Sequence, residues 1–210
     1  MHPTSESPTP SQTTYLYQTS LPLLTAEQAA PDAAAILADT KAQLGFAPNM
    51  YGAMAQAPGL LETYVEGYQR FRAGSGFTPV EQEVIFLVIS RFNACHYCVA
   101  AHSVVADLMS RVPVEVTDAI REGRPVPDQR LAALEAFTRH MLESRGTPSR
   151  EAAVRFIEAG YQERQILALI LAIAVKTMSN YTNHLFQTPV DAMFASRAWT
   201  PLPGQPAARP

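Results

Sequence analysis

The sequence predicts an all-α protein, and three observations lead to this class. Apolar residues recur at the three- and four-residue spacing of a helix face along most of the chain. Residues that favour helix starts stand before these segments, and Gly or Pro follows most of them. No segment shows the sustained alternation of apolar and polar residues that is typical of a strand. We therefore expect one helical domain over residues 21–195.

Both ends of the chain differ in composition from this domain. Residues 1–20 are rich in Pro, Ser and Thr, and the end of residues 196–210 is rich in Pro. Such segments bury too little apolar surface to offset the entropy lost on ordering. We expect a disordered tail at each end.

The composition also limits the classes of function. Of the 210 residues, 47% are hydrophobic and only 17% are charged, so we expect a homo-oligomer that covers apolar surface. The net charge of -3 gives no electrostatic footprint for nucleic acid. A secretory signal is absent, and the longest apolar run, Ile166–Val175, is shorter than the roughly 20 residues that span a bilayer. A cytoplasmic protein without membrane contact is expected.

The first two helices are delimited by glycine and proline. One is expected over residues 25–43, ending at Gly45, with an interruption at Pro31 left open. The second follows Pro58 and ends at a loop over residues 74–76. It carries apolar or aromatic residues at helical spacing, namely Leu60, Leu61, Tyr64, Val65 and Tyr68.

The next helix has the sharpest start signal. Thr78 can act as the N-cap, Pro79 suits the first helical position, and Glu81 completes a capping box. Residues 84–89 are six apolar residues in a row, so this helix must be buried nearly all round. Asn93 marks its end.

The remaining helices follow from similar signals. A helix from Cys95 to Met109 comes directly after Asn93. The others are a short helix before Gly123, a helix over residues 129–144 capped by Asp128, one opened by Thr147 and Pro148 and ended by Gly160, and a long one over residues 162–187 that Pro189 stops.

The two cysteines of the chain stand three positions apart, at Cys95 and Cys98. In a reducing compartment such a pair is more often catalytic or metal-binding than structural. On a helix, Cys95, Cys98 and His102 share one face. One thiol could attack a substrate while the other resolves the product as a disulfide, and His102 could accept the proton of Cys98.

Two further features bear on the thiolate that this chemistry needs. Cys95 lies near a helix N-terminus, where the macrodipole favours negative charge and a lower thiol pKa. Glu83 lies on an otherwise apolar helix and would be costly there without a partner. It could be a proton relay with a raised pKa, or only an ion-pair partner.

Other interpretations stay open for this segment. The pair could be half of a zinc site, although His96 and His102 are the only further ligands nearby, or two inert buried thiols. His96 fits a surface or interface position, and Tyr97 fits packing. Asn180 and His184 near the end of the last helix could line the cysteine pocket, or could simply be polar as that helix reaches solvent.

The spacing of these residues resembles a known family. Glu83, eleven residues, Cys95-x-x-Cys98, three residues and His102 are similar to the AhpD-like alkylhydroperoxidases of the carboxymuconolactone decarboxylase superfamily. The resemblance extends over most of residues 20–195. Its further segments, typical of the peroxidase-related branch, are Leu44-Gly45, Pro48-Asn49-Met50, Asn180-Tyr181 and Thr188-Pro189-Val190-Asp191.

The resemblance implies an all-helical fold that assembles as a dimer, trimer or hexamer. It implies that Cys98 attacks a hydroperoxide, that Cys95 resolves, and that Glu83 and His102 relay protons. A dithiol, thioredoxin-like or lipoyl reductant would return the electrons, with no metal or other cofactor. The best-known members carry His directly before the second cysteine, where this chain has Tyr97.

The leading prediction is therefore an antioxidant enzyme, a thiol peroxidase with a redox-active disulfide. Two alternatives keep the cysteine pair, namely a disulfide reductase that serves another peroxidase and an oligomeric redox-sensing binding protein. A lactone decarboxylase fits least well, since that branch of the superfamily lacks the CxxC motif.

Overall fold

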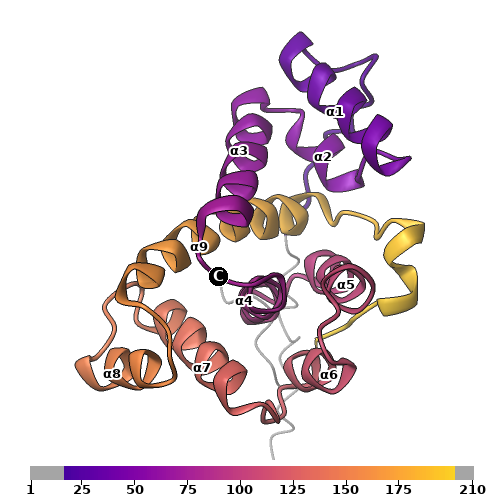
Figure 1. Ribbon diagram of the computed structural model, residues 1–210. Helices are drawn as coiled ribbons and strands as arrows, with labels where there is room; N and C mark the ends of the chain where they lie inside the picture. Colours follow the sequence, from indigo (N-terminus) through magenta and orange to yellow (C-terminus); the bar gives the residue numbers. More distant parts are fainter. Residues whose placement is uncertain (1–16, 202–210) are drawn as a thin grey trace, which may run out of the picture.

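The computed structural model describes residues 17–201, and in this part every regular element is helical (Figure 1). This confirms the predicted all-α class. The α-helices are α1 (Pro31–Leu44), α2 (Asn49–Met54), α3 (Pro58–Gly74), α4 (Pro79–Phe92), α5 (His96–Val104), α6 (Val114–Glu122), α7 (Gln129–Glu143), α8 (Arg150–Glu158) and α9 (Glu163–Phe186). A π-helical segment, Val105–Ser110, continues α5, and a 3₁₀ segment, Ala192–Arg197, follows α9.

Helix α4 lies at the centre of the molecule, with α3, α5, α6, α7 and α9 around it (Figure 1). The predicted capping box is present, since Thr78 Oγ1 accepts from the Glu81 amide at 3.3 Å and Glu81 Oε2 accepts from the Thr78 amide at 2.8 Å. Residues 84–89 are 0 to 4% exposed, as the unbroken apolar run predicts. The start and the burial of this helix are thus confirmed.

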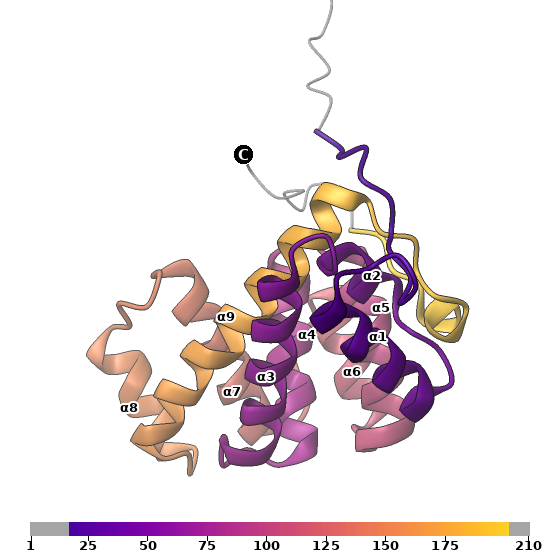
Figure 2. The same cartoon turned by 90° about the horizontal axis from the view of Figure 1, so that it is seen from above.

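Two apolar clusters make up the core. The larger joins α4 to α7, α8 and α9, and the smaller joins α1, α2 and α3 to the cysteine segment. Figure 2 shows the same division, with α8 at one end of the molecule and α1, α5 and the 3₁₀ segment at the other. The cysteines therefore lie where the smaller cluster meets the central helix.

The start of the first helix was predicted too early. It begins at Pro31, not at residue 25, because Ala30 is extended with ψ 153° and proline suits the first helical turn. Residues 25–28 form a turn instead, in which the Gln28 amide donates to the Thr25 carbonyl. Gly45 ends the helix as predicted, in the left-handed region with φ 83°.

One further helix and two further helix boundaries also differ from the prediction. Helix α2 was not predicted, because six residues are too few to show a periodic pattern. Regular α-helix after the cysteines ends at Val104, and the π-helical turn carries the chain on to Ser110. Helix α8 is capped by Ser149, whose Oγ accepts from the Ala152 amide at 3.2 Å, so Thr147 precedes the helix and does not open it.

Most of the two predicted tails, residues 1–16 and 202–210, lies outside the described residues. The described ends contact the domain. The Thr19 amide donates to the Leu185 carbonyl at 2.9 Å. Arg197 pairs with Asp107 at 3.0 Å and Asp118 at 2.7 Å, and Trp199 Nε1 donates to a backbone carbonyl of α6 at 3.0 Å.

Among the described residues, α9 alone has the length and apolar composition of a membrane-spanning helix. The apolar run considered in the sequence is only the middle of this 24-residue helix. Leu169, Ala172 and Val175 are fully buried and form the face of α9 that packs in the core. The apolar character of this face is therefore explained by its place between α3 and α4.

Candidate active site around Cys95 and Cys98

The cysteine pair occupies the start of α5. Cys95 is the N-cap, directly after Ala94, whose backbone is in the left-handed region with φ 54°. Cys98 follows in the first helical turn, and both thiols are free and buried. From α9, the Asn183 side-chain amide donates to Cys98 Sγ at 3.2 Å, and the Ser179 hydroxyl lies 3.8 Å from the same sulfur. Two side chains of one neighbouring helix, α9, thus hold the sulfur of Cys98.

The two thiols differ in acidity. Burial raises the pKa of Cys95 well above its usual range, and the neighbouring Cys98 adds to the effect. Burial acts on Cys98 in the same direction, but the hydrogen bond from Cys95 and the charge of Lys176 outweigh it and lower the pKa of Cys98 well below its usual range. The expectation from the helix dipole that Cys95 is the more acidic thiol is wrong, because both thiols are buried and the hydrogen bond between them favours the thiolate of Cys98.

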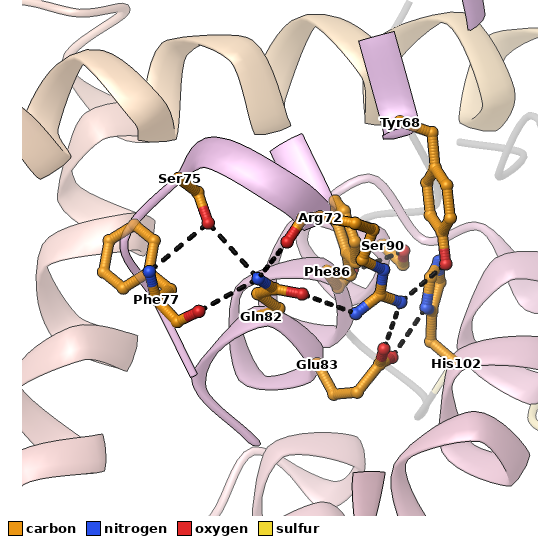
Figure 3. A network of polar contacts seen from close by, with 9 residues as sticks. All are labelled: Tyr68, Arg72, Ser75, Phe77, Gln82, Glu83, Phe86, Ser90 and His102. Carbon is orange, nitrogen blue, oxygen red and sulfur yellow. Dashed lines mark hydrogen bonds and ion pairs between the residues drawn. The ribbon is translucent and has the colours of Figure 1, made fainter. Parts of the chain in front are cut away.

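Glu83 is fully buried on α4 and has two partners, His102 and Arg72 (Figure 3). His102 Nδ1 lies 2.8 Å from Glu83 Oε2, and Arg72 from α3 forms an ion pair with Oε1. Arg72 also donates to Tyr68 Oη at 2.6 Å and to Gln82 Oε1 at 3.1 Å. The carboxylate that looked costly in the sequence is therefore the centre of a network from three helices.

The protonation states in this network follow from its contacts. Burial works to raise the pKa of Glu83, but His102 and Arg72 outweigh it and lower that pKa. Of the two roles that the sequence left open for Glu83, the lowered pKa therefore favours the ion-pair partner, and Glu83 is a carboxylate at neutral pH. Burial, together with Lys176, lowers the pKa of His102. A neutral His102 that donates from Nδ1 to Glu83 has its lone pair on Nε2, where it can act as a base.

The segments that carried the family resemblance meet beside the cysteines. The Tyr97 hydroxyl donates to Asp191 Oδ2 at 2.5 Å, and the Asn49 amide donates to Asp191 Oδ1 at 3.2 Å. His96 Nε2 lies 3.2 Å from the carbonyl of Thr188. Asp191 thus ties the loop after α9 to the start of α2 and to the cysteine helix.

A cavity of about 420 Å³ opens next to Cys98. Its wall is mostly apolar and aromatic, and the polar side chains in it include Cys98, His102, Arg72 and Lys176. The apolar and aromatic wall residues are Leu44, Phe46, Pro48, Met50, Tyr51, Tyr64, Tyr68, Tyr97, Ala101, Val105, Met109, Met193 and Phe194. Cys95 does not border this space, so Cys98 is the thiol that a molecule in the cavity would meet.

The other candidate residues, Asn180, His184 and His96, do not border the cavity. Asn180 is fully buried, and its Oδ1 accepts from the Asn93 side-chain amide at 2.8 Å. His184 and His96 are half-buried. The described residues contain no group of three or more His, Cys, Asp or Glu side chains arranged to hold a metal ion.

Sequence reasoning missed Arg72, Lys176 and Asp191 in this region. Only Lys176 had a readable signal, because it is a single charge that ends the apolar run of the last helix. The argument that a buried charge needs a partner, applied to Glu83, would have singled it out too. Asp191 stood in a segment of the family resemblance, but its contacts with Tyr97 and Asn49, like that of Arg72 with Glu83, could be recognised only from the tertiary structure.

No family description matches the chain, and no curated protein is similar to it in sequence. Solved structures are similar in fold. An AhpD-core peroxidase-related protein from Ralstonia eutropha superposes with a TM-score of 0.74 at 19% identity, covering 83% of this chain and 93% of that one. A peroxidase-related protein from Silicibacter gives 0.71 at 20% identity, covering 89% and 99%.

A third similar structure is the debrominase Bmp8 in complex with 2,3,4-tribromopyrrole. It gives a TM-score of 0.69 at 18% identity, covering 86% of this chain and 96% of that chain. Fold and site together define an all-helical protein with a buried CxxC pair beside a Glu–His couple. The chain has the AhpD-like fold, as the spacing of its cysteine motif predicted.

Proposed function

We propose that this protein is a thiol-dependent peroxidase that reduces organic hydroperoxides. The observation that carries the proposal is the asymmetry of the cysteine pair. Cys98 borders the cavity, and its surroundings favour a thiolate, whereas Cys95 is buried behind it and stays protonated. A nucleophile and a resolving thiol have these opposite requirements.

The cycle has three steps. The Cys98 thiolate attacks the terminal oxygen of the hydroperoxide, the O–O bond breaks, and the alkoxide takes up a proton to leave as an alcohol. The sulfur is now a sulfenic acid, and the Cys95 thiol displaces its hydroxyl as water to form the Cys95–Cys98 disulfide. An external dithiol, of the thioredoxin-like or lipoyl class, returns two electrons and two protons.

The Glu83 network prepares the first step. His102, through Nε2, takes the proton from Cys98 when the thiolate forms and passes it on to solvent, which returns the imidazole to its neutral form. Glu83 holds the opposite nitrogen of the ring, and Arg72 holds Glu83. Each member is fixed by the next, so the base keeps one tautomer and one orientation.

The cavity wall favours an organic hydroperoxide over hydrogen peroxide. Burying an apolar side group of phenyl size contributes about 1.5–3 kcal/mol, and about 1.4 kcal/mol is a factor of ten. We expect kcat/KM for cumene hydroperoxide to exceed that for hydrogen peroxide by about tenfold or more. Stopped-flow consumption by pre-reduced protein with a small dithiol measures this ratio.

The same assay distinguishes the remaining roles. A reduced protein that consumes neither peroxide, but exchanges disulfides with a second peroxidase, would be a redox partner. One that oxidises once and does not turn over with any dithiol would be a sensor. Either result would overturn the peroxidase proposal.

A second candidate is reductive removal of halogen from an aromatic ring. The aromatic wall of the cavity and the fold shared with the debrominase Bmp8 favour it. The Cys98 thiolate would take the halogen as a sulfenyl halide while the ring carbon takes a proton. Cys95 would then displace halide to close the disulfide. Release of bromide from a bromopyrrole by the reduced protein is the measurement.

We further propose that the protein is a homo-oligomer with an interface on the outer side of α9. Leu167, Ile170, Tyr181 and Leu185 are 47 to 68% exposed and recur on one side of this helix. Large apolar side chains that are exposed on one side of a helix are typical of a surface covered by a partner.

Light scattering coupled to size exclusion tests this assembly. We expect a species larger than a monomer, and dissociation when Leu167→Lys and Ile170→Lys are combined. Val114→Lys, at an equally exposed apolar residue on α6, is the control and should leave the mass unchanged. A monomeric wild-type protein would contradict the proposal.

A further inference from the structure

Lys176 is a buried charge that the cycle described above does not use. It lies on α9, is 1% exposed, and borders the cavity together with Cys98 and His102. Its Nζ lies 5.7 Å from the ring centroid of Phe86. Within residues 17–201 no carboxylate forms an ion pair with it. A buried ammonium without an anionic partner is costly, so its position calls for an anion in the cavity.

The geometry of α9 indicates which anion this is. Lys176, Ser179 and Asn183 stand at positions i, i+3 and i+7, so they share one face of the helix. Ser179 and Asn183 are the two side chains of α9 that contact Cys98 Sγ. The face that carries Lys176 is therefore the face that α9 turns toward the sulfur.

The charges around the cavity also indicate that the anion opposite Lys176 is the Cys98 thiolate. Arg72 is matched by Glu83, and His102 is neutral, so Lys176 is the cation left without a carboxylate. Burial raises the pKa values of Tyr64 and Tyr97, which therefore stay neutral. The titratable and charged groups around Cys98 are, by element, Tyr51 on α2, Tyr64, Tyr68 and Arg72 on α3, Glu83 on α4, Cys95, Tyr97 and His102 in the cysteine segment, Lys176 and His184 on α9, and Asp191 after α9.

We propose that Lys176 is a catalytic residue, the counter-ion of the Cys98 thiolate before attack and the proton donor to the leaving alkoxide after it. The proposal rests on the peroxidase function proposed above. When sulfur attacks the terminal oxygen, one negative charge passes from sulfur to the departing oxygen. The Lys176 ammonium then gives that oxygen a proton, the alcohol leaves, and the neutral amine recovers a proton from solvent. The negative charge that Lys176 faces therefore stays in the cavity, first on sulfur and then on oxygen, until the proton is transferred.

The first test is a titration of Cys98 that involves no hydroperoxide. In a Cys95→Ser background, the rate of alkylation by iodoacetamide is measured against pH. Lys176→Met should move the midpoint upward by about one pH unit or more, since an opposite charge nearby favours the thiolate. Lys176→Arg keeps the charge and should keep the midpoint low. The chain has one other lysine, the exposed Lys41, and Lys41→Met is the matched control.

The second test measures the proton donor. At a pH where Cys98 is ionised in each variant, Lys176→Met should slow reaction with cumene hydroperoxide by about a hundredfold, within the range for loss of a general acid. A peroxyacid, whose leaving carboxylate needs no proton, should be slowed by less than about threefold. A merely structural lysine would slow both oxidants equally.

The outcomes separate this proposal from the function on which it rests. An unmoved alkylation midpoint in Lys176→Met overturns the counter-ion role whether or not peroxide is consumed. Equal slowing of both oxidants overturns the proton-donor role. If wild-type protein reacts with neither oxidant, the peroxidase function and the donor role fail together, while the alkylation midpoint still decides the counter-ion role. Lys176→Gln, a polar neutral variant, replaces Lys176→Met if the latter does not fold.

Discussion

We expect Cys98→Ser to abolish the proposed consumption of hydroperoxide at every pH, because it removes the one thiol that borders the cavity in the described residues. A serine hydroxyl is not acidic enough to replace the thiolate, so the loss should reach the background rate of the assay. Stopped-flow measurement with pre-reduced protein and an organic hydroperoxide gives this result directly.

Cys95→Ser is the matched control, since it removes a buried thiol that does not border the cavity. We expect this variant to consume about one equivalent of hydroperoxide and then stop, with Cys98 trapped as a sulfenic acid. A dimedone adduct on Cys98, detected by mass spectrometry, identifies that state. If Cys95→Ser were inactive and Cys98→Ser retained the single turnover, the assignment of the two thiols would be reversed.

Glu83→Gln causes the second large effect, on both stability and activity. The substitution leaves Arg72 without its buried counter-ion and His102 without the carboxylate that fixes its tautomer. Breaking one partner of a buried pair costs about 3–5 kcal/mol, and loss of an oriented base lowers the rate by about a hundredfold. Urea unfolding and the hydroperoxide assay measure the two effects.

Two further variants show whether the effect belongs to the buried network. Glu66→Gln removes one partner of an exposed ion pair with Arg70 and should change stability by less than about 1 kcal/mol. Adding Arg72→Met to Glu83→Gln should restore part of the lost stability, because the uncompensated cation is removed as well. A loss that is additive in the double variant would argue against coupling between the two residues.

The same carboxylate gives stability a dependence on pH. Folding lowers the pKa of Glu83 from its ordinary value of 4.5, so the contribution of this carboxylate to stability is complete above that pH. It is lost as the pH falls through the lower folded pKa, where the carboxylate takes up a proton. The stability of Glu83→Gln should therefore fall less steeply in acid than that of the wild-type protein.

The sequence was most informative where a local rule decides the structure. The capping box of Thr78 and Glu81 and the six apolar residues after it identified the central helix and its burial. The spacing of Glu83, Cys95, Cys98 and His102 identified the residues that meet at the site, because the chain brings them together on two adjacent helices.

What could not be predicted depends on helices that are distant in sequence. Arg72 neutralises Glu83 only because α3 packs beside α4, and Asn183 reaches Cys98 only because α9 crosses α5. The pKa order of the two thiols depends on the hydrogen bond between them and on Lys176 of α9, and a helix-dipole argument contains neither. The short α2 was invisible because it is held by its neighbours and not by a pattern of its own.

The polar and charged side chains around Cys98 have an electrochemical consequence. Asn183, Ser179 and Lys176 all favour a negative charge on Cys98, and that charge exists only in the reduced protein. A dithiol whose reduced form is stabilised makes its disulfide a strong oxidant. The oxidised protein would leave Lys176 with no anion to face, which raises the reduction potential further. A mild cellular dithiol is then a sufficient electron donor, and a strongly reducing one is not required.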